Sequence, residues 1–455
     1  MAVTKNRINQ IKAAGLNHLW MHNRDWIKTG EYGGPDIIVD ANGVEVIDIE
    51  GNSWIDVNGG YSSVNVGYGR TEVADAVKEQ MLRIPYFPQG TTTIPAIRLA
   101  EKLASILPGN LERSWLVSGG SEANETAVKI ARSYHSRVGE NGRYKVISRR
   151  GSYHGATAGV LWMGSGVDRV DYEPSPPGML YVPQPNSYRC EFGSRTEEEC
   201  AVRCAEAVER MILFHGPETI AAFIGEPISA SALAAVPGDI YWPMLREICQ
   251  KYGVLLIADE VITGFGRTGK MFASDHWDLV PDLMTVAKGI TSSYVPMAAA
   301  IAKREVADVF SGPENIFRQA LTSGGHPISA AAALANIEII ESDKLVENSA
   351  KMGSYFKDKL MDLKVDHPIM GDVRGLGLLL GVELVKNHVT KEKFPEEFRL
   401  GEKLTEQFRN NRLILSGNDK GVSLSPPLCV RQNEIETIVD RLDKAFTAIE
   451  VEMSD

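Results

Sequence analysis

The chain has 455 residues, of which 44% are hydrophobic and 24% charged, and its formal net charge is −11. This length predicts two or three lobes of an ordinary globular protein, and a negative charge without a basic patch argues against nucleic acid or an anionic membrane as a partner. No signal peptide or membrane-spanning run is visible, so we expect a cytoplasmic protein, and the five scattered cysteines predict reduced thiols and no metal site.

The predicted elements begin with a hairpin over residues 43–57, in which "EGN" forms the turn between two β-rich runs. Through the middle of the chain, apolar strands alternate with helix-length segments, and we expect the strands over residues 113–117, 144–148, 220–225, 254–258 and 283–287. This alternation predicts a mainly parallel sheet with helices on both faces.

From about residue 325 the chain is helix-rich, with one strand pair around "VRGLGLLLGVELV". We therefore predict an α/β fold with a smaller α+β domain built from both termini. Residues 66–330 would form the large domain, and residues 1–65 and 331–455 the small one.

Candidate binding residues follow the first two central strands, because chemistry in open α/β sheets gathers at the carboxyl ends of the strands. After the first, Gly120 and Ser121 open a helix in "SGGSEANETAVKIAR". Exposed N–H groups at a glycine-rich helix start can bind phosphate, although an ordinary helix cap would look the same. After the second, Tyr153 in "SYHG" can cover a flat ligand or simply pack on the surface.

Charged residues follow the next three strands: Glu226, Asp259 and Lys288. Asp259 by itself can be a helix cap. Lys288 follows the apolar run "PDLMTVA", where a charged ammonium is expensive to desolvate and a neutral amine is a nucleophile toward an aldehyde. An acid that faces a pyridine nitrogen makes the ring an electron sink. Together with a phosphate cup and a stacking aromatic, this set predicts pyridoxal 5′-phosphate (PLP).

The motifs that carry these residues occur in the order of a known family. They are "VIDIEGNSWIDVNGG", "VNVGYGR", "SGGSEANETAVKIAR", "SYHG", "GEP", "DEVITGFGRTGKMFA", "PDLMTVAKGI", "SGGHPISAAAALA" and "VRGLGLLLGVEL". Over almost its whole length the chain resembles a class III aminotransferase, an enzyme of PLP fold type I.

The resemblance implies a role for each matching residue around the PLP ring. Lys288 would form the Schiff base with the cofactor and shuttle the proton, and Asp259 would pair with the pyridinium nitrogen. Val261 and Tyr153 would cover the two ring faces. Glu226 would lie near the ring hydroxyl and help to fix Asp259 and Tyr153.

The resemblance also implies how the phosphate is held and how subunits assemble. Gly120 and Ser121 would hold the phosphate, and Thr322 in "LTSGGHP" would reach the phosphate of a neighbouring subunit. A homodimer, or a dimer of dimers, with shared active sites is therefore expected.

Within the family, the chain is most similar to the amine:pyruvate and ω-amino acid:pyruvate group, and there to the taurine–pyruvate branch. Ile262 stands where members that use glutamate or ornithine have a glutamine. The resemblance implies a ping-pong transfer of an amino group from a primary amine or ω-amino acid to a 2-oxo acid, pyruvate first among them.

Two positions depart from the pattern of that group. Ser62 stands where many members have a tryptophan, and Ser416 where many have an arginine that pairs with the substrate carboxylate. Either Arg412 or Lys420 replaces that cation, or the donor carries no carboxylate there. The candidate substrate contacts are Tyr61, Ser62, Tyr153 and Ser416.

Other functions stay open at this point. A lyase, an aminomutase or a decarboxylating enzyme on the same scaffold would keep Lys288 and Asp259. A non-catalytic protein that binds PLP or another metabolite is the alternative from a different class, since fold does not settle function.

Overall fold

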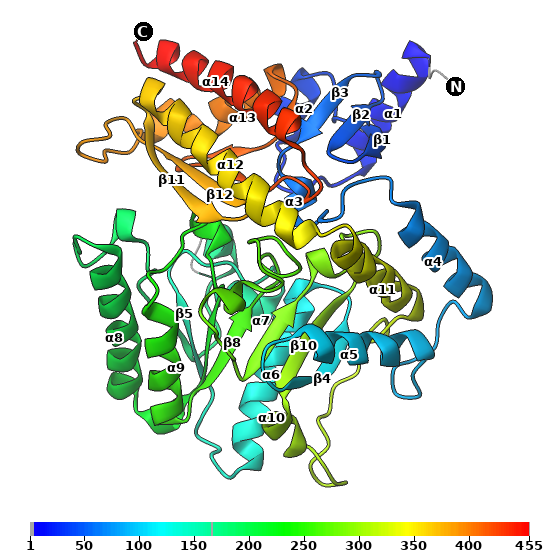
Figure 1. Cartoon of the computed structure of the whole chain (residues 1–455), viewed down its shortest axis with the longest axis vertical. Helices are drawn as coiled ribbons and strands as arrows, with labels where there is room; N and C mark the ends of the chain where they lie inside the picture. Colours follow the sequence, from blue (N-terminus) through cyan, green and yellow to red (C-terminus); the bar gives the residue numbers. More distant parts are fainter. Residues whose placement is uncertain (1–3, 165–166, 455) are drawn as a thin grey trace.

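The computed structural model describes residues 4–164 and 167–454, and its centre is a seven-stranded sheet of order β4-β10-β9-β8-β7-β5-β6 (Figure 1). The strands are β4 (Leu111–Val117), β5 (Lys145–Arg149), β6 (Met179–Val182), β7 (Ile220–Gly225), β8 (Leu255–Asp259), β9 (Leu283–Val286) and β10 (Ala298–Lys303). Strands β6, β5, β7, β8 and β9 pair in parallel, and β10 lies antiparallel between β9 and β4. The predicted mainly parallel sheet is thus confirmed.

The prediction missed two strands of this sheet, β6 and β10. β6 is a short edge strand whose side chains are mostly half-buried. β10 reads "AAAIAK", and alanine is a strong helix former and a poor strand former, so local preference hides the strand. Its place between two other strands overrides that preference.

Helices cover both faces of the sheet, because its strands are apolar on both sides. Leu255 and Ile257 of β8 pack with residues of α6 (Gly120–Arg137) on one face. Leu256 points to the other face, toward α8 (Glu197–His215) and α9 (Tyr241–Tyr252). On that second face, α5 (Ile94–Ile106) and α11 (Pro327–Ser342) cover the half around β4, β10 and β9.

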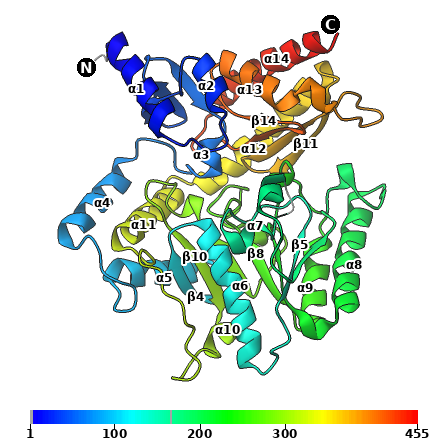
Figure 2. The same ribbon diagram turned by 180° about the vertical axis from the view of Figure 1, so that it is seen from behind.

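The two ends of the chain come together above this sheet (Figure 2). One sheet of order β1-β2-β3-β13 joins β1 (Ile38–Asn42), β2 (Glu45–Asp48) and β3 (Ser53–Asp56) to β13 (Leu413–Ile414). Strands β2 and β3 are antiparallel, so the predicted hairpin is confirmed. A second sheet joins β11 (Met370–Leu376), β12 (Leu379–Leu384), β15 (Gly421–Leu424) and β14 (Gly417–Asn418). The domain boundaries at residues 65 and 330 stay predictions.

The remaining helices are α1 (Lys5–His18), α2 (Trp26–Glu31), α3 (Gly59–Ser62), α4 (Thr71–Arg83), α7 (Ala158–Leu161), α10 (Arg304–Asp308), α12 (Leu345–Asp366), α13 (Leu400–Asn410) and α14 (Gln432–Ser454). Among the described residues, no helix combines the length and apolar character that crossing a membrane requires.

Candidate active site

Four neighbouring strands of the central sheet end at one edge, and a candidate residue follows or closes each of them. Tyr153 lies in the loop after β5, Glu226 directly after β7, Asp259 at the end of β8 and Lys288 two residues after β9. Because these strands are parallel neighbours, their carboxyl ends share one edge of the sheet. The edge therefore gathers one amine, two carboxylates and an aromatic ring.

Lys288 begins a short 3-10 helix, Lys288–Ile290, with a φ of 46°, a left-handed conformation that is uncommon for a lysine. No hydrogen bond or ion pair within residues 4–164 and 167–454 holds its Nζ. Burial lowers the pKa of the Lys288 amine to about 8, while the negative charges of Asp259 and Glu226 act in the opposite direction. The structure thus provides an amine that loses its proton near neutral pH.

Asp259 is buried and its carboxylate accepts three hydrogen bonds. The backbone N–H of Val261 donates to Oδ1 at 3.0 Å. Nδ2 of Asn124 donates to Oδ2 at 2.8 Å, and Nδ1 of His154 lies 2.7 Å from the same oxygen. A carboxylate offers about four acceptor positions, so one remains on Oδ1 for a further donor.

Sequence analysis did not predict Asn124, His154 or Thr285 as site residues, although all three lie around Asp259. The Thr285 hydroxyl donates to Oδ1 of Asn124 at 2.7 Å. For Thr285, the signal that could have found it is a polar residue inside the apolar stretch "LMTVA" on β9, whereas Asn124 stands in the polar stretch "SEANET" and gives no such signal. A buried polar group must be hydrogen-bonded, so such residues indicate a network.

The start of α6 lies beside Val261. A Cβ added to Gly120 would approach Cγ1 of Val261 to 2.9 Å, so only glycine fits there without a shift. No side chain caps this helix, whose first turn keeps its N–H groups for another acceptor. Ser121 Oγ accepts a bond from the N–H of Ala156 at 3.1 Å, which leaves its hydroxyl hydrogen to donate. This helix start has the donors of an anion site.

Glu226 is buried and held by the turn that follows it. Its carboxylate accepts hydrogen bonds from the hydroxyls of Ser229 and Ser231 at 3.0 and 3.1 Å, and from the N–H of Ala230 at 3.0 Å. The expectation that Glu226 helps to fix Asp259 finds no support in these bonds, because the donors to Asp259 come from elsewhere. The negative charge of Glu226 instead acts on Lys288, whose pKa it raises against the effect of burial.

Tyr61 and Ser62 lie in a turn with left-handed φ angles of 63° and 61°. The turn is tied down because Asp56 accepts hydrogen bonds from the N–H groups of Asn58 and Gly60. Tyr61 is exposed. Ser62 Oγ lies 2.7 Å from Oγ of Ser425, so a serine here joins the N-terminal turn to the "SPPL" segment.

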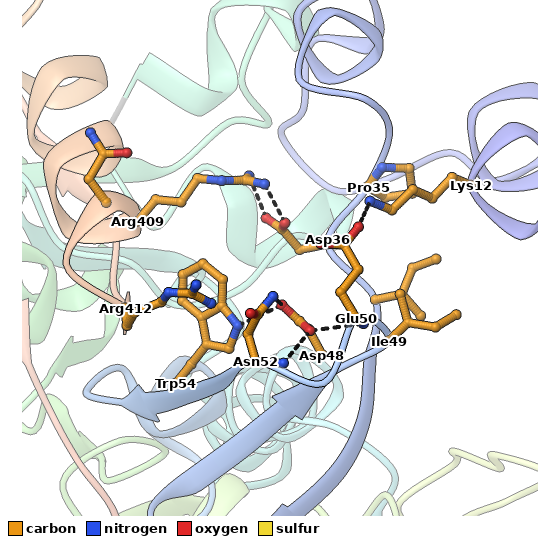
Figure 3. A pocket seen from close by; sticks show the side chains of 12 residues that line it. Lys12, Pro35, Asp36, Asp48, Ile49, Glu50, Asn52, Trp54, Arg409 and Arg412 are labelled. Carbon is orange, nitrogen blue, oxygen red and sulfur yellow. Dashed lines mark hydrogen bonds and ion pairs between the residues drawn. The ribbon is translucent and has the colours of Figure 1, made fainter. Parts of the chain in front are cut away.

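Ser416 is exposed, and the two nearby cations lie differently. The Arg412 guanidinium stacks 5.1 Å from the centre of the Trp54 ring, in a pocket of about 300 Å³ (Figure 3). The pocket is lined by residues of the two chain ends: Lys12, Pro35, Asp36, Ile37, Asp48, Ile49, Glu50, Asn52, Trp54, Arg409, Asn410 and Arg412. Apart from Arg412 itself, no candidate site residue lines this pocket. Lys420 is exposed in the turn between β14 and β15.

Thr322 is exposed, and its carbonyl accepts a hydrogen bond from the Tyr86 hydroxyl at 2.8 Å. Leu321, the preceding residue, packs against the apolar cluster that includes Val117, Ala287 and Val261. Thr322 is therefore presented at the surface, and the residue before it packs against a cluster that also contains Ala123, in the first part of α6.

The residues at this edge fit PLP. Lys288 supplies an unbonded amine for the aldehyde, and Oδ1 of Asp259 keeps one acceptor position for a protonated ring nitrogen. Nε2 of His154 is buried without a hydrogen-bond partner in the part of the chain that the structure describes. The uncapped start of α6 supplies donors for the phosphate, and the Tyr153 side chain is 47% exposed in the loop after β5.

Known proteins resemble this chain over most of its length. The model of the family described as aminotransferase class-III matches residues 32–446. The taurine–pyruvate aminotransferase of Bilophila wadsworthia is 40% identical over 439 residues, which cover 91% of this chain and 93% of the relative. The putrescine–pyruvate aminotransferase of Pseudomonas aeruginosa is 37% identical, and the match covers 96% of each chain. An (S)-enantioselective ω-transaminase from Thermomicrobium roseum has a TM-score of 0.94 at 38% identity, covering 97% of this chain and 98% of that one.

Proposed function

This chain belongs to the class-III aminotransferase family, and from that premise we propose that it moves the amino group of a primary amine to pyruvate. It is a PLP-dependent transaminase, as the resemblance implied. The observation that carries the proposal is the unbonded amine of Lys288, which lies at one sheet edge with the hydrogen-bonded carboxylate of Asp259.

Each residue at this edge of the sheet has a separate role in the proposed reaction. PLP supplies an aldehyde that takes the amino group and a ring that accepts electron density. Lys288 Nζ, when neutral, would take the proton from the amine-bearing carbon of the substrate and would deliver it to the carbon of PLP that began as its aldehyde. Asp259 keeps the ring nitrogen protonated, and the first turn of α6 with Ser121 binds the phosphate. Val261 and Tyr153 hold the ring between them, and Glu226 supports the charge of Lys288.

The decisive experiment follows the nitrogen. The protein loaded with PLP is mixed with one ¹⁵N-labelled amine at a time, from a panel of taurine, β-alanine, 4-aminobutyrate, putrescine and 1-phenylethylamine, and then with pyruvate. Transamination predicts labelled alanine and loss of the cofactor's visible absorbance before pyruvate is added. Labelled ammonia without any labelled alanine would instead show a lyase and overturn the proposal.

Raising the pH from about 7 to about 9 is expected to speed the attachment of PLP to the apoenzyme about tenfold, because a pKa of about 8 takes Lys288 from mostly protonated to mostly neutral. Only the neutral amine is nucleophilic, so the rate rises with pH. The rise of visible absorbance in a stopped-flow instrument measures this rate, and the rate for PLP with a free alkylamine is measured beside it at each pH. A free alkylamine, whose pKa is about 10.5, should gain about a hundredfold over the same range. An enzyme rate that rises by that larger factor, or that does not rise, would contradict the lowered pKa.

We also propose that the amine donor carries no carboxylate at the place of Ser416. The family arginine is absent there, and Arg412 lies over Trp54. Putrescine, in the name of one relative, has no acid group, and taurine, in the name of the other, carries a sulfonate in place of a carboxylate. A neighbouring ω-transaminase was engineered for bulky amines by changes that included removal of a tryptophan and an arginine. In this chain, Ser62 and Ser416 likewise stand where the resemblance leads us to expect a tryptophan and an arginine.

The variant Ser416→Arg is expected to raise kcat/KM for β-alanine about tenfold or more, because a charge-assisted pair with the carboxylate forms. It should leave 1-phenylethylamine, which has no carboxylate, nearly unchanged. Steady-state kinetics with pyruvate measure both. Ser311→Arg, on the exposed segment after α10, is the matched control and should change neither donor. Equal gains for both amines would argue against a carboxylate contact at position 416.

We further propose a homodimer in which Thr322 reaches the partner's phosphate site. The surface of α4 and α5 leaves large apolar side chains in water, among them Leu82 at 80% and Ile94 at 70% exposure. Tyr86 and Phe87, which lie between these two helices, are also exposed, and the Tyr86 hydroxyl donates to the Thr322 carbonyl. Such a patch is typical of a subunit interface. The cytoplasmic location stays a prediction.

The variant Ile94→Glu is expected to halve the molar mass measured by light scattering at micromolar concentration, because a charge would be buried at the interface. Val365→Glu is the control, since Val365 on α12 is 83% exposed and is not among these residues. If Ile94→Glu keeps the mass of the unchanged protein, this face is not the interface.

A further inference from the structure

A buried chain of hydrogen bonds connects Thr285, on the strand β9 that precedes Lys288, to the carboxylate of Asp259. Thr285 Oγ1 donates to Oδ1 of Asn124 at 2.7 Å. Nδ2 of Asn124 then donates to two acceptors, the carbonyl of His154 at 2.7 Å and Oδ2 of Asp259 at 2.8 Å. Asn124 is 1% exposed and Thr285 0%, so water does not compete for these groups.

The two acceptors and one donor around Asn124 decide which way its amide points. A carbonyl and a carboxylate can only accept, so the NH₂ group must face His154 and Asp259. The hydroxyl of Thr285 then faces the amide oxygen and donates to it. Thr285 thereby holds the amide in the orientation in which it serves Asp259.

The amide also determines which part of the Asp259 carboxylate is left for the cofactor. Asn124 and His154 occupy Oδ2, and the N–H of Val261 takes one position on Oδ1. The remaining acceptor position is on Oδ1. Without the amide, the carboxylate would lose one of its three hydrogen bonds, and the carbonyl of His154 would lose a donor.

We propose that Asn124 is a positioning residue for Asp259, and that Thr285 acts only through Asn124 by fixing its amide. The inference rests on the proposed role of Asp259 toward the ring nitrogen of PLP. Neither Asn124 nor Thr285 is proposed to touch the reacting atoms. Their effect is expected on PLP affinity and on kcat, and much less on KM for the amine.

The test measures the dissociation constant of PLP from the apoenzyme by tryptophan fluorescence quenching, beside kcat and KM. Asn124→Ala should weaken PLP binding about ten- to a hundredfold, the range of one hydrogen bond to a charged group. Thr285→Val, which keeps the volume and removes the hydroxyl, should weaken it about three- to tenfold, and Thr285→Ser should restore it. Thr126→Val removes a buried hydroxyl that donates within α6 to Glu122, and should leave PLP affinity unchanged.

The double variant decides whether Thr285 works through Asn124. In the Asn124→Ala background, Thr285→Val should cost nothing further, because its acceptor is gone. Additive costs, or unchanged PLP affinity in folded Thr285→Val, would overturn the proposal. If Asn124→Ala does not fold, the comparison of Thr285→Val, Thr285→Ser and Thr126→Val still decides. Failure of the unchanged protein to bind PLP or to use any amine would refute the proposed function instead.

Discussion

Replacing Lys288 with alanine is expected to lower kcat for transamination by about 10⁴-fold or more, the scale seen when a nucleophile that also transfers protons is removed. The variant loses the amine that bonds to PLP and the base that moves the substrate proton. The side chain is partly buried and unbonded within the described residues, so no neighbour replaces it. Single-turnover absorbance with the best amine of the panel, over hours, measures the residual rate.

Two further variants test whether the loss of rate comes from the loss of a neutral amine at position 288. Lys288→Arg keeps the positive charge, but a guanidinium does not lose its proton at neutral pH, so it should be nearly as inactive as alanine. Lys270→Ala removes an exposed lysine from the loop after β8 and should keep full activity. A Lys288→Ala protein that retained more than about a hundredth of the rate would show that another base carries the proton.

The change Asp259→Asn is expected to lower kcat by about 10²- to 10⁴-fold and to weaken PLP binding. Asparagine has nearly the same shape but no charge to hold the ring nitrogen protonated. Its NH₂ group would also face donors, because Val261, Asn124 and His154 all direct hydrogens at this carboxylate. Steady-state kinetics at saturating PLP and a PLP titration of the apoenzyme measure the two effects.

Asp282→Asn is the matched control for this prediction. Asp282 is also a buried aspartate of the β8–β9 region, but it lies before β9, at the opposite edge of the sheet. It accepts the N–H of Leu256 and pairs with Arg246 and Lys303. Its loss should lower the melting temperature and leave kcat per PLP-loaded site unchanged. If both variants lost the same fraction of kcat, the effect of Asp259→Asn would be one of stability, and its proposed role would be wrong.

Much of the central sheet could be predicted from local pattern. The strands β4, β5, β7, β8 and β9 all lie within two residues of the expected ranges. β7, β8 and β9 are mostly apolar runs, as a strand covered by helices on both faces requires, and the shorter apolar parts of β4 and β5 were enough to place those two strands. The placement of Tyr153, Glu226, Asp259 and Lys288 followed from the same pattern, because each comes directly or shortly after a recognisable strand.

Local pattern was enough to predict five of the seven central strands, the mainly parallel pairing of the sheet and, through the motifs, the family and the cofactor. The fold alone revealed the strands β6 and β10, the stacking of Arg412 on Trp54, and the hydrogen-bond chain of Thr285, Asn124 and Asp259. The difference lies in how far along the chain each interaction acts. Apolar periodicity and turn residues act over a few neighbours, whereas Asn124 and Thr285 are 161 residues apart and meet only because α6 packs against β9.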